Sequence, residues 1–170
     1  MSAISMYAAS VPVFDRMLNN LSAILDKAMA HCAARKIEPQ VLLNMRLSPD
    51  MFTLTRQVQI ACDFAKGTAA RLAGVEVPKY DDDESTFADL KARIAKTQAF
   101  IRTLSTGQID GSETREISIT IAGTPTTFKG LPYLLHFALP NFYFHATTAY
   151  GILRHAGVEL GKRDFIGGTN

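Results

Sequence analysis

Apolar residues recur at helical spacing in the early part of the chain, and this periodicity constrains the fold more than any other feature of the sequence. In residues 11–35 they return every three or four positions, which places them on one face of a helix. These residues are Phe14, Met17, Leu18, Leu21, Ile24, Leu25 and Ala28. A second such stripe runs from about residue 51 to residue 73, after Ser48-Pro49-Asp50, where Asp50 is the predicted N-cap. The sequence therefore predicts two long helices that each bury one face.

A third helix is predicted over residues 86–104. Gly74 is a typical C-terminal cap of the second helix, and Thr86 with Asp89 three residues on forms a capping-box pattern. Between them lies an acidic run, residues 81–84. Such a run can bind a cation, or it can place negative charge at a helix N-terminus, where the helix dipole favours it. The adjacent capping box favours the second interpretation.

The periodicity then changes from helix to strand. Residues 116–121 alternate strictly between polar and apolar side chains, residues 122–125 suit a turn, and residues 126–129 return as a second strand. A last helix follows from Gly130 to His155, with Pro140 expected to kink it or to end its first segment near Leu139. The tail after residue 159 is expected to be extended.

These elements predict an all-α fold: a single domain over residues 1–170, built as an antiparallel four-helix bundle with a short β-hairpin before the last helix. A net charge of +2 with no basic cluster argues against a nucleic-acid surface. No apolar run is long enough for a membrane span, and the N-terminus lacks a signal-peptide pattern, so the cytoplasm is the expected compartment. Cys32 and Cys62 are expected to be reduced core residues.

The last helix carries a polar stripe within an aromatic segment. At 100° per residue, Asn141, His145 and Thr148 lie on one face, flanked by bulky rings. Buried polar groups need partners, so this stripe is either a hydrogen-bond network or a site. On the second helix, Gln57 and Gln59 flank the apolar face and complete a candidate pocket. Pocket-lining residues are thus predicted to be Gln57, Gln59, Asn141, His145 and Thr148.

Only one of the histidines near this stripe is a candidate metal ligand. His155 lies about 15 Å beyond His145 along the axis, at roughly 1.5 Å per residue, and His136 lies beyond Pro140. A single histidine on such a helix is more often a hydrogen-bonded core residue than a ligand. Arg71 is interpreted as a surface or salt-bridge residue. The chain carries no phosphate-binding loop, nucleophile elbow, CxxC or HExxH motif, so its catalytic residues are unknown.

The element order, together with three segments, resembles the DinB/YfiT-like superfamily, and more narrowly a bacterial branch that carries a domain-of-unknown-function label. The segments are residues 45–52, 57–63 and 134–145. The resemblance implies a divalent-metal site made by one histidine on the second helix and a His-x-x-x-His pair on the fourth. It also implies thiol-transferase or isomerase-like chemistry. In this chain the pair becomes Asn141 and His145, and the remaining ligand becomes Gln57 or Gln59, so one of three ligands is retained.

Two hypotheses follow from the sequence. In the first, the protein binds a small molecule or a partner in a polar pocket at a degenerate metal site, with no tightly held cofactor. In the alternative, it is a metal-dependent enzyme in which His145 helps to hold zinc or nickel. Whether the protein is an enzyme stays open at this stage. A homodimer is a further expectation, because helices with exposed aromatic residues readily pair.

Overall fold

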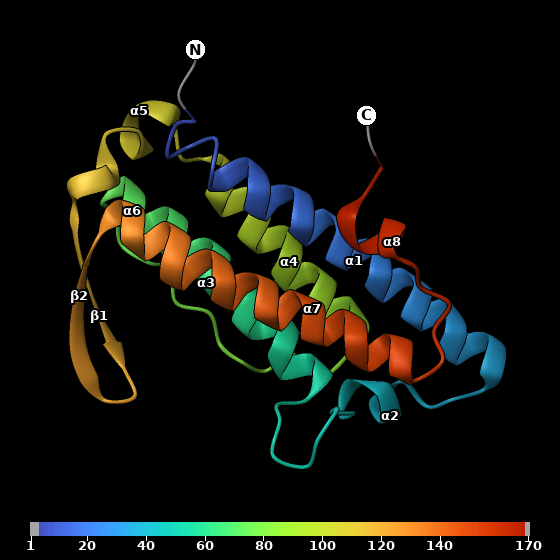
Figure 1. Ribbon diagram of the computed structural model, residues 1–170. Coiled ribbons are helices and arrows are strands. Elements are labelled where there is room, and N and C mark those ends of the chain that lie inside the picture. Colours follow the sequence, from blue (N-terminus) through green and yellow to red (C-terminus); the bar gives the residue numbers. More distant parts are fainter. Residues whose placement is uncertain (1–3, 169–170) are drawn as a thin grey trace.

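Long helices packed side by side form the body of the protein, as the computed structural model shows for residues 4–168 (Figure 1). They are α1 (Val11–Arg35), α3 (Leu54–Ala73), α4 (Phe87–Arg102) and α7 (Leu139–His155). Helix α3 packs most extensively against α7 and also contacts α4, while α1 packs against α4. The predicted apolar stripes face this core, where Phe14, Leu18 and Phe142 have no exposed surface. The described chain is mostly helical.

The helix ends follow local capping chemistry. Gly74 ends α3 with φ +71°, and Thr86 with Asp89 forms the predicted capping box of α4. The predicted N-cap at Asp50 is wrong. Helix α3 begins only after Thr53, whose hydroxyl accepts a hydrogen bond from the Arg56 amide, whereas Asp50 accepts one from the Ser48 hydroxyl at 2.6 Å. Both residues have cap-forming side chains, and the later one is the cap.

Short helices fill the connections. They are α2 (Pro39–Leu43), α5 (Thr106–Ile109), the 3₁₀ turn η1 (Ser112–Thr114) and α8 (Lys162–Ile166). The expectation of an extended tail is therefore wrong for α8, which packs on α1. There Phe165 meets the ring of Tyr150 at a centroid distance of 5.7 Å. This aromatic contact stabilises α8, which is too short for a helical periodicity to be recognised in the sequence.

The hairpin lies at one end of the helical body (Figure 1). Strands β1 (Glu116–Ile121) and β2 (Thr124–Lys129) are antiparallel, with Ile117 opposite Phe128 and Thr120 opposite Pro125. The turn is only Ala122-Gly123, with φ values of +47° and +83°, and not the predicted residues 122–125. Pro125 belongs to a strand instead, because a two-stranded ribbon leaves edge positions where no N–H is needed.

The last helix runs without a break from Gly130 to His155, through α6 (Gly130–Pro132), the π-helical segment η2 (Tyr133–Ala138) and α7. The amide of Leu139 donates to the carbonyl of Leu134, five residues back. The π-helical segment ends two residues before Pro140, which has no amide hydrogen to give to an α-helical bond. The predicted segment boundary near Leu139 is thus a change of helix type.

No helix within residues 4–168 is long and apolar enough to cross a membrane. Both cysteines are unpaired and buried. Burial raises the pKa of the Cys62 thiol to about 12, so this thiol stays protonated at neutral pH and packs as a small apolar side chain.

Candidate functional site

Two of the residues predicted to line a pocket meet between α3 and α7. The Nδ1 atom of His145 lies 2.7 Å from Oε1 of Gln57, and both side chains are buried. Gln57 directs its Nε2 amide group to the carbonyl of Phe52 at 3.3 Å. Since the amide group donates there, its oxygen faces the ring, and the Nδ1 of His145 carries the proton. The lone pair of the imidazole is therefore on Nε2.

The surroundings of His145 favour the neutral ring. Phe64 stacks on it at a centroid distance of 6.0 Å, and Phe144 meets it edge-on at 5.3 Å. Burial, assisted by the positive charge of Arg56, lowers the pKa of His145 below its ordinary value. At neutral pH the ring therefore offers an uncharged acceptor at Nε2.

The other three predicted residues have different partners. Gln59 faces the acidic connector, where it donates to Glu84 at 2.8 Å and accepts from Arg56 at 3.1 Å. Asn141 donates to the carbonyl of Phe137, and Thr148 donates to that of Phe144, both at 2.7 Å and both within their own helix. Of the five residues, Gln57 and His145 are the two that are hydrogen-bonded to each other.

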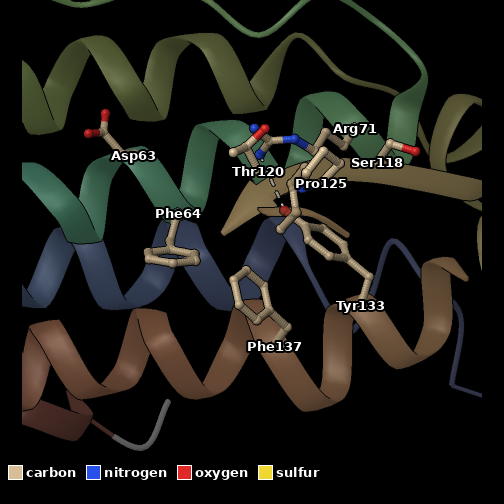
Figure 2. A pocket seen from close by; sticks show the side chains of 9 residues that line it. Asp63, Phe64, Arg71, Ser118, Thr120, Pro125, Tyr133 and Phe137 are labelled. Carbon is tan, nitrogen blue, oxygen red and sulfur yellow. Dashed lines mark hydrogen bonds between the residues drawn. The ribbon is translucent and has the colours of Figure 1, made fainter. Parts of the chain in front are cut away.

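A cavity of about 540 Å³ lies beside this pair, between α3, η2 and the hairpin (Figure 2). Its lining residues are Asp63, Phe64, Arg71, Ser118, Ile119, Thr120, Pro125, Tyr133 and Phe137. None of the five predicted residues is among them. Phe64 lines the cavity and also stacks on His145, so His145 lies one side chain away from it.

Residues 6–166 match a family model described as a domain of unknown function, DUF1993. The chain belongs to the DUF1993 family. It is also similar to a DinB family member protein from Shewanella denitrificans, known from a crystal structure at 1.83 Å resolution. That similarity has 45% sequence identity and a TM-score of 0.87, and it covers 96% of this chain and 92% of the other. No curated protein matches the chain.

These two findings place this DUF1993 chain in the DinB-like superfamily, as the resemblance predicts. They also make it necessary to test whether its residues fit a metal ion. Within residues 4–168 no three His, Cys, Asp or Glu side chains gather as a ligand set. The amide of Gln57 is hydrogen-bonded at both its oxygen and its nitrogen. The imidazole of His145 beside an amide that is already hydrogen-bonded is a poor set of ligands for zinc or nickel.

The acidic run of this DUF1993 chain has a role that the sequence did not predict. Arg93 on α4, with 2% of its side chain exposed, pairs with Asp63, Asp82 and Glu84 at 2.8, 3.0 and 2.9 Å. Asp82 and Glu84 of the run thus form ion pairs with the guanidinium of Arg93. This network holds the connector between α3 and α4 along both helices.

Sequence reasoning missed the residues that line the cavity. Tyr133 and Phe137 are four positions apart, and this spacing predicts that they share one face of the helix. Arg71 was interpreted as a surface or salt-bridge residue. It is instead half-buried and forms no ion pair with any of residues 4–168, and it donates to the hydroxyl of Tyr133 at 3.2 Å. Nothing in the sequence alone brings the hairpin over these residues.

Proposed function

We propose that this protein binds a small molecule at the Gln57–His145 pair of an antiparallel four-helix bundle, and that it holds no tightly bound metal. The observation that carries this proposal is the 2.7 Å hydrogen bond between His145 Nδ1 and Gln57 Oε1. Gln57 stands at a position where the resemblance implies a metal ligand, and its amide is used to orient the ring. The ring keeps a lone pair at Nε2 for a ligand that donates a hydrogen bond.

Metal analysis of the untagged protein tests the first part. We expect much less than one zinc or nickel ion per chain after purification, and one transition-metal ion per chain would overturn the proposal. A matched control is the double variant Gln57→His with Asn141→His, which restores three imidazoles on the two helices. This variant is expected to retain one zinc ion per chain, because its donor set suits the metal.

Binding at His145 is tested with phenol, a neutral hydrogen-bond donor with an apolar ring. We expect phenol to shift the ¹⁵N resonance of His145 Nε2 in the wild-type protein. The Thr147→Ala variant, changed at an exposed position on the same helix, is expected to respond in the same way. An Nε2 resonance that is unchanged at saturating phenol would contradict binding at this atom.

A second function is favoured by one specific observation. A ring that donates from Nδ1 to a fixed acceptor and directs Nε2 outward is the usual arrangement of a metal-ligating histidine. In this alternative, His145 would help to hold zinc or nickel for thiol-transferase or isomerase-like chemistry. Loss of zinc binding and of thiol transfer in His145→Ala would support the alternative, and unchanged values would exclude it.

We also propose that the protein acts in the cytoplasm as a homodimer, with a small molecule and no nucleic acid as its partner. The exposed rings of Phe144 and Tyr143, at 58% and 37%, support a contact on the outer face of α7. Light scattering of the wild-type protein and of Phe144→Ser tests this. The wild type is expected to have twice the mass of one chain, and the variant is expected to have the mass of one.

A further inference from the structure

The cavity between α3, η2 and the hairpin is a second candidate binding site. Its proposed ligand does not depend on binding at the Gln57–His145 pair. We infer that the cavity binds an organic carboxylate with a flat aromatic body, whose charge is held by Arg71. Its volume of about 540 Å³ is in the usual range of small-molecule sites. Its lining combines a wall of aromatic rings with a few polar groups, which is the composition that such sites have.

The charges at the cavity favour an anion. Asp63 is already neutralised by Lys66 at 3.0 Å and by Arg93 at 2.8 Å. Arg71, the other charged lining residue, has no carboxylate partner within residues 4–168. The uncompensated charge is therefore positive. A guanidinium group can donate two parallel hydrogen bonds to one carboxylate, so Arg71 suits this anion in geometry as well as in charge.

The aromatic rings define the rest of the ligand. Phe64 and Phe137 have a centroid distance of 5.8 Å, and Phe137 and Tyr133 are stacked at 5.9 Å with an interplanar angle of 28°. Figure 2 shows the three rings in a row, with the hydroxyl of Tyr133 directed toward Arg71. A flat apolar body can lie against the stacked rings of Phe137 and Tyr133 while its carboxylate reaches the guanidinium. The ring of Phe64, tilted by 58° to that of Phe137, lies at the other end of this body.

Gly67 provides the space in which the Arg71 guanidinium lies. A Cβ atom at this position would be only 2.5 Å from Nη1 of Arg71, and the three atoms nearest to it all belong to that guanidinium. The glycine is one helical turn before Arg71, in the interior of α3. Its lack of a side chain thus allows the arginine to lie flat against the helix, where the Tyr133 hydroxyl can hold it.

Binding of 2-naphthoate, followed by its own fluorescence anisotropy, tests this inference, since the chain contains no tryptophan to interfere. The neutral isostere 2-naphthamide is the matched ligand. We expect the wild-type protein to bind the carboxylate about tenfold or more tightly than the amide, as a charge-assisted hydrogen bond requires. Equal affinities, or no binding of 2-naphthoate, would overturn the inference.

Two variants test the role of Arg71. Arg71→Gln is expected to abolish the preference for the carboxylate, while Arg35→Gln, at an exposed arginine of α1, is expected to keep it. Gly67→Ala retains every charge and displaces the guanidinium, so its affinity for 2-naphthoate should fall about fivefold or more with unchanged circular dichroism. Arg71→Gln should leave the phenol-induced shift of His145 Nε2 unchanged, which separates this cavity from the Gln57–His145 pair. A carboxylate preference that survives in Arg71→Gln, or an unchanged affinity for 2-naphthoate in Gly67→Ala, would contradict our assignment.

Discussion

His145 and Gln57 are 88 positions apart in the chain, yet Nδ1 of one lies 2.7 Å from Oε1 of the other. The carbonyl of Phe52 accepts from the same glutamine, so three groups in series fix both the amide orientation and the imidazole tautomer. This relationship joins α3 to α7 in the interior. The fold thereby determines which nitrogen of the buried His145 ring carries the proton.

We expect acid to destabilise the protein partly through His145. Burial and Arg56 lower its pKa in the folded state, so the unfolded chain takes up this proton at a higher pH. The stabilisation is therefore complete above about pH 6.5 and is lost as the pH falls through the lowered value. Urea unfolding at about pH 7.5 and about pH 5.5 measures this loss. It should be smaller in His145→Gln than in the wild type, and equal losses would contradict the prediction.

Gln57→Leu should cost about 1–3 kcal/mol in the free energy of unfolding, because it leaves the Nδ1–H of His145 buried without an acceptor. The double variant Gln57→Leu with His145→Phe removes both polar partners. It should be more stable than the single variant, because no unpaired donor remains. Urea denaturation of the wild type, both single variants and the double variant gives the coupling. Additive effects would mean that the hydrogen bond contributes nothing.

Arg93→Met should destabilise the protein by about 3 kcal/mol. The change leaves the nearly buried carboxylate of Glu84 without its charged partner, and such losses are typically about 3–5 kcal/mol. Asp63 and Asp82 are partly exposed, so we expect a loss of stability at the lower end of this range. The control is Lys91→Met, which removes a solvent-exposed pair with Asp26 and should cost less than about 1 kcal/mol. Similar losses in the two variants, measured by urea unfolding, would refute a special role for Arg93.

Ala122→Asn should stabilise the hairpin. Ala122 has φ +47° in a two-residue turn, a conformation that asparagine tolerates better than alanine. A gain of about 0.5–1 kcal/mol would raise the hydrogen-exchange protection of β1 and β2 amides about two- to fivefold. Gly123→Ala, at φ +83°, should lower it instead. Unchanged protection in both variants would show that the turn does not limit opening of the hairpin.

The long helices could be predicted from the sequence because burial imposes their periodicity. Local signals were less decisive where two of them compete. Asp50 and Thr53 both have side chains that can cap a helix, but Asp50 accepts from the Ser48 hydroxyl and Thr53 accepts from the helix. Pro125 suits a turn by its ring, but its place opposite Thr120 depends on strand pairing. Helix α8 depends on a contact with Tyr150 that no local pattern contains.

The candidate site was predictable only in part for a related reason. Helical spacing puts Asn141, His145 and Thr148 on one face, but it cannot say which of them bond back to their own helix. The contact of Gln57 with His145 needs the crossing of α3 and α7. The cavity needs the hairpin as a third wall, so Arg71 resembles a surface residue until that wall is in place.

The π-helical segment Tyr133–Ala138 has one consequence for how this chain tolerates change. A π turn contains one more residue than the α turn it replaces, so it absorbs that residue within one turn and keeps the two sides of the helix in phase. Deleting the exposed Leu135 would restore an α turn and leave both the hairpin side and α7 facing the core. The same deletion within α7 would rotate one side against the other by about 100°, carrying Tyr133 away from Arg71. The last helix can therefore lose a residue in the π-helical segment at far smaller cost to the cavity than it can in α7.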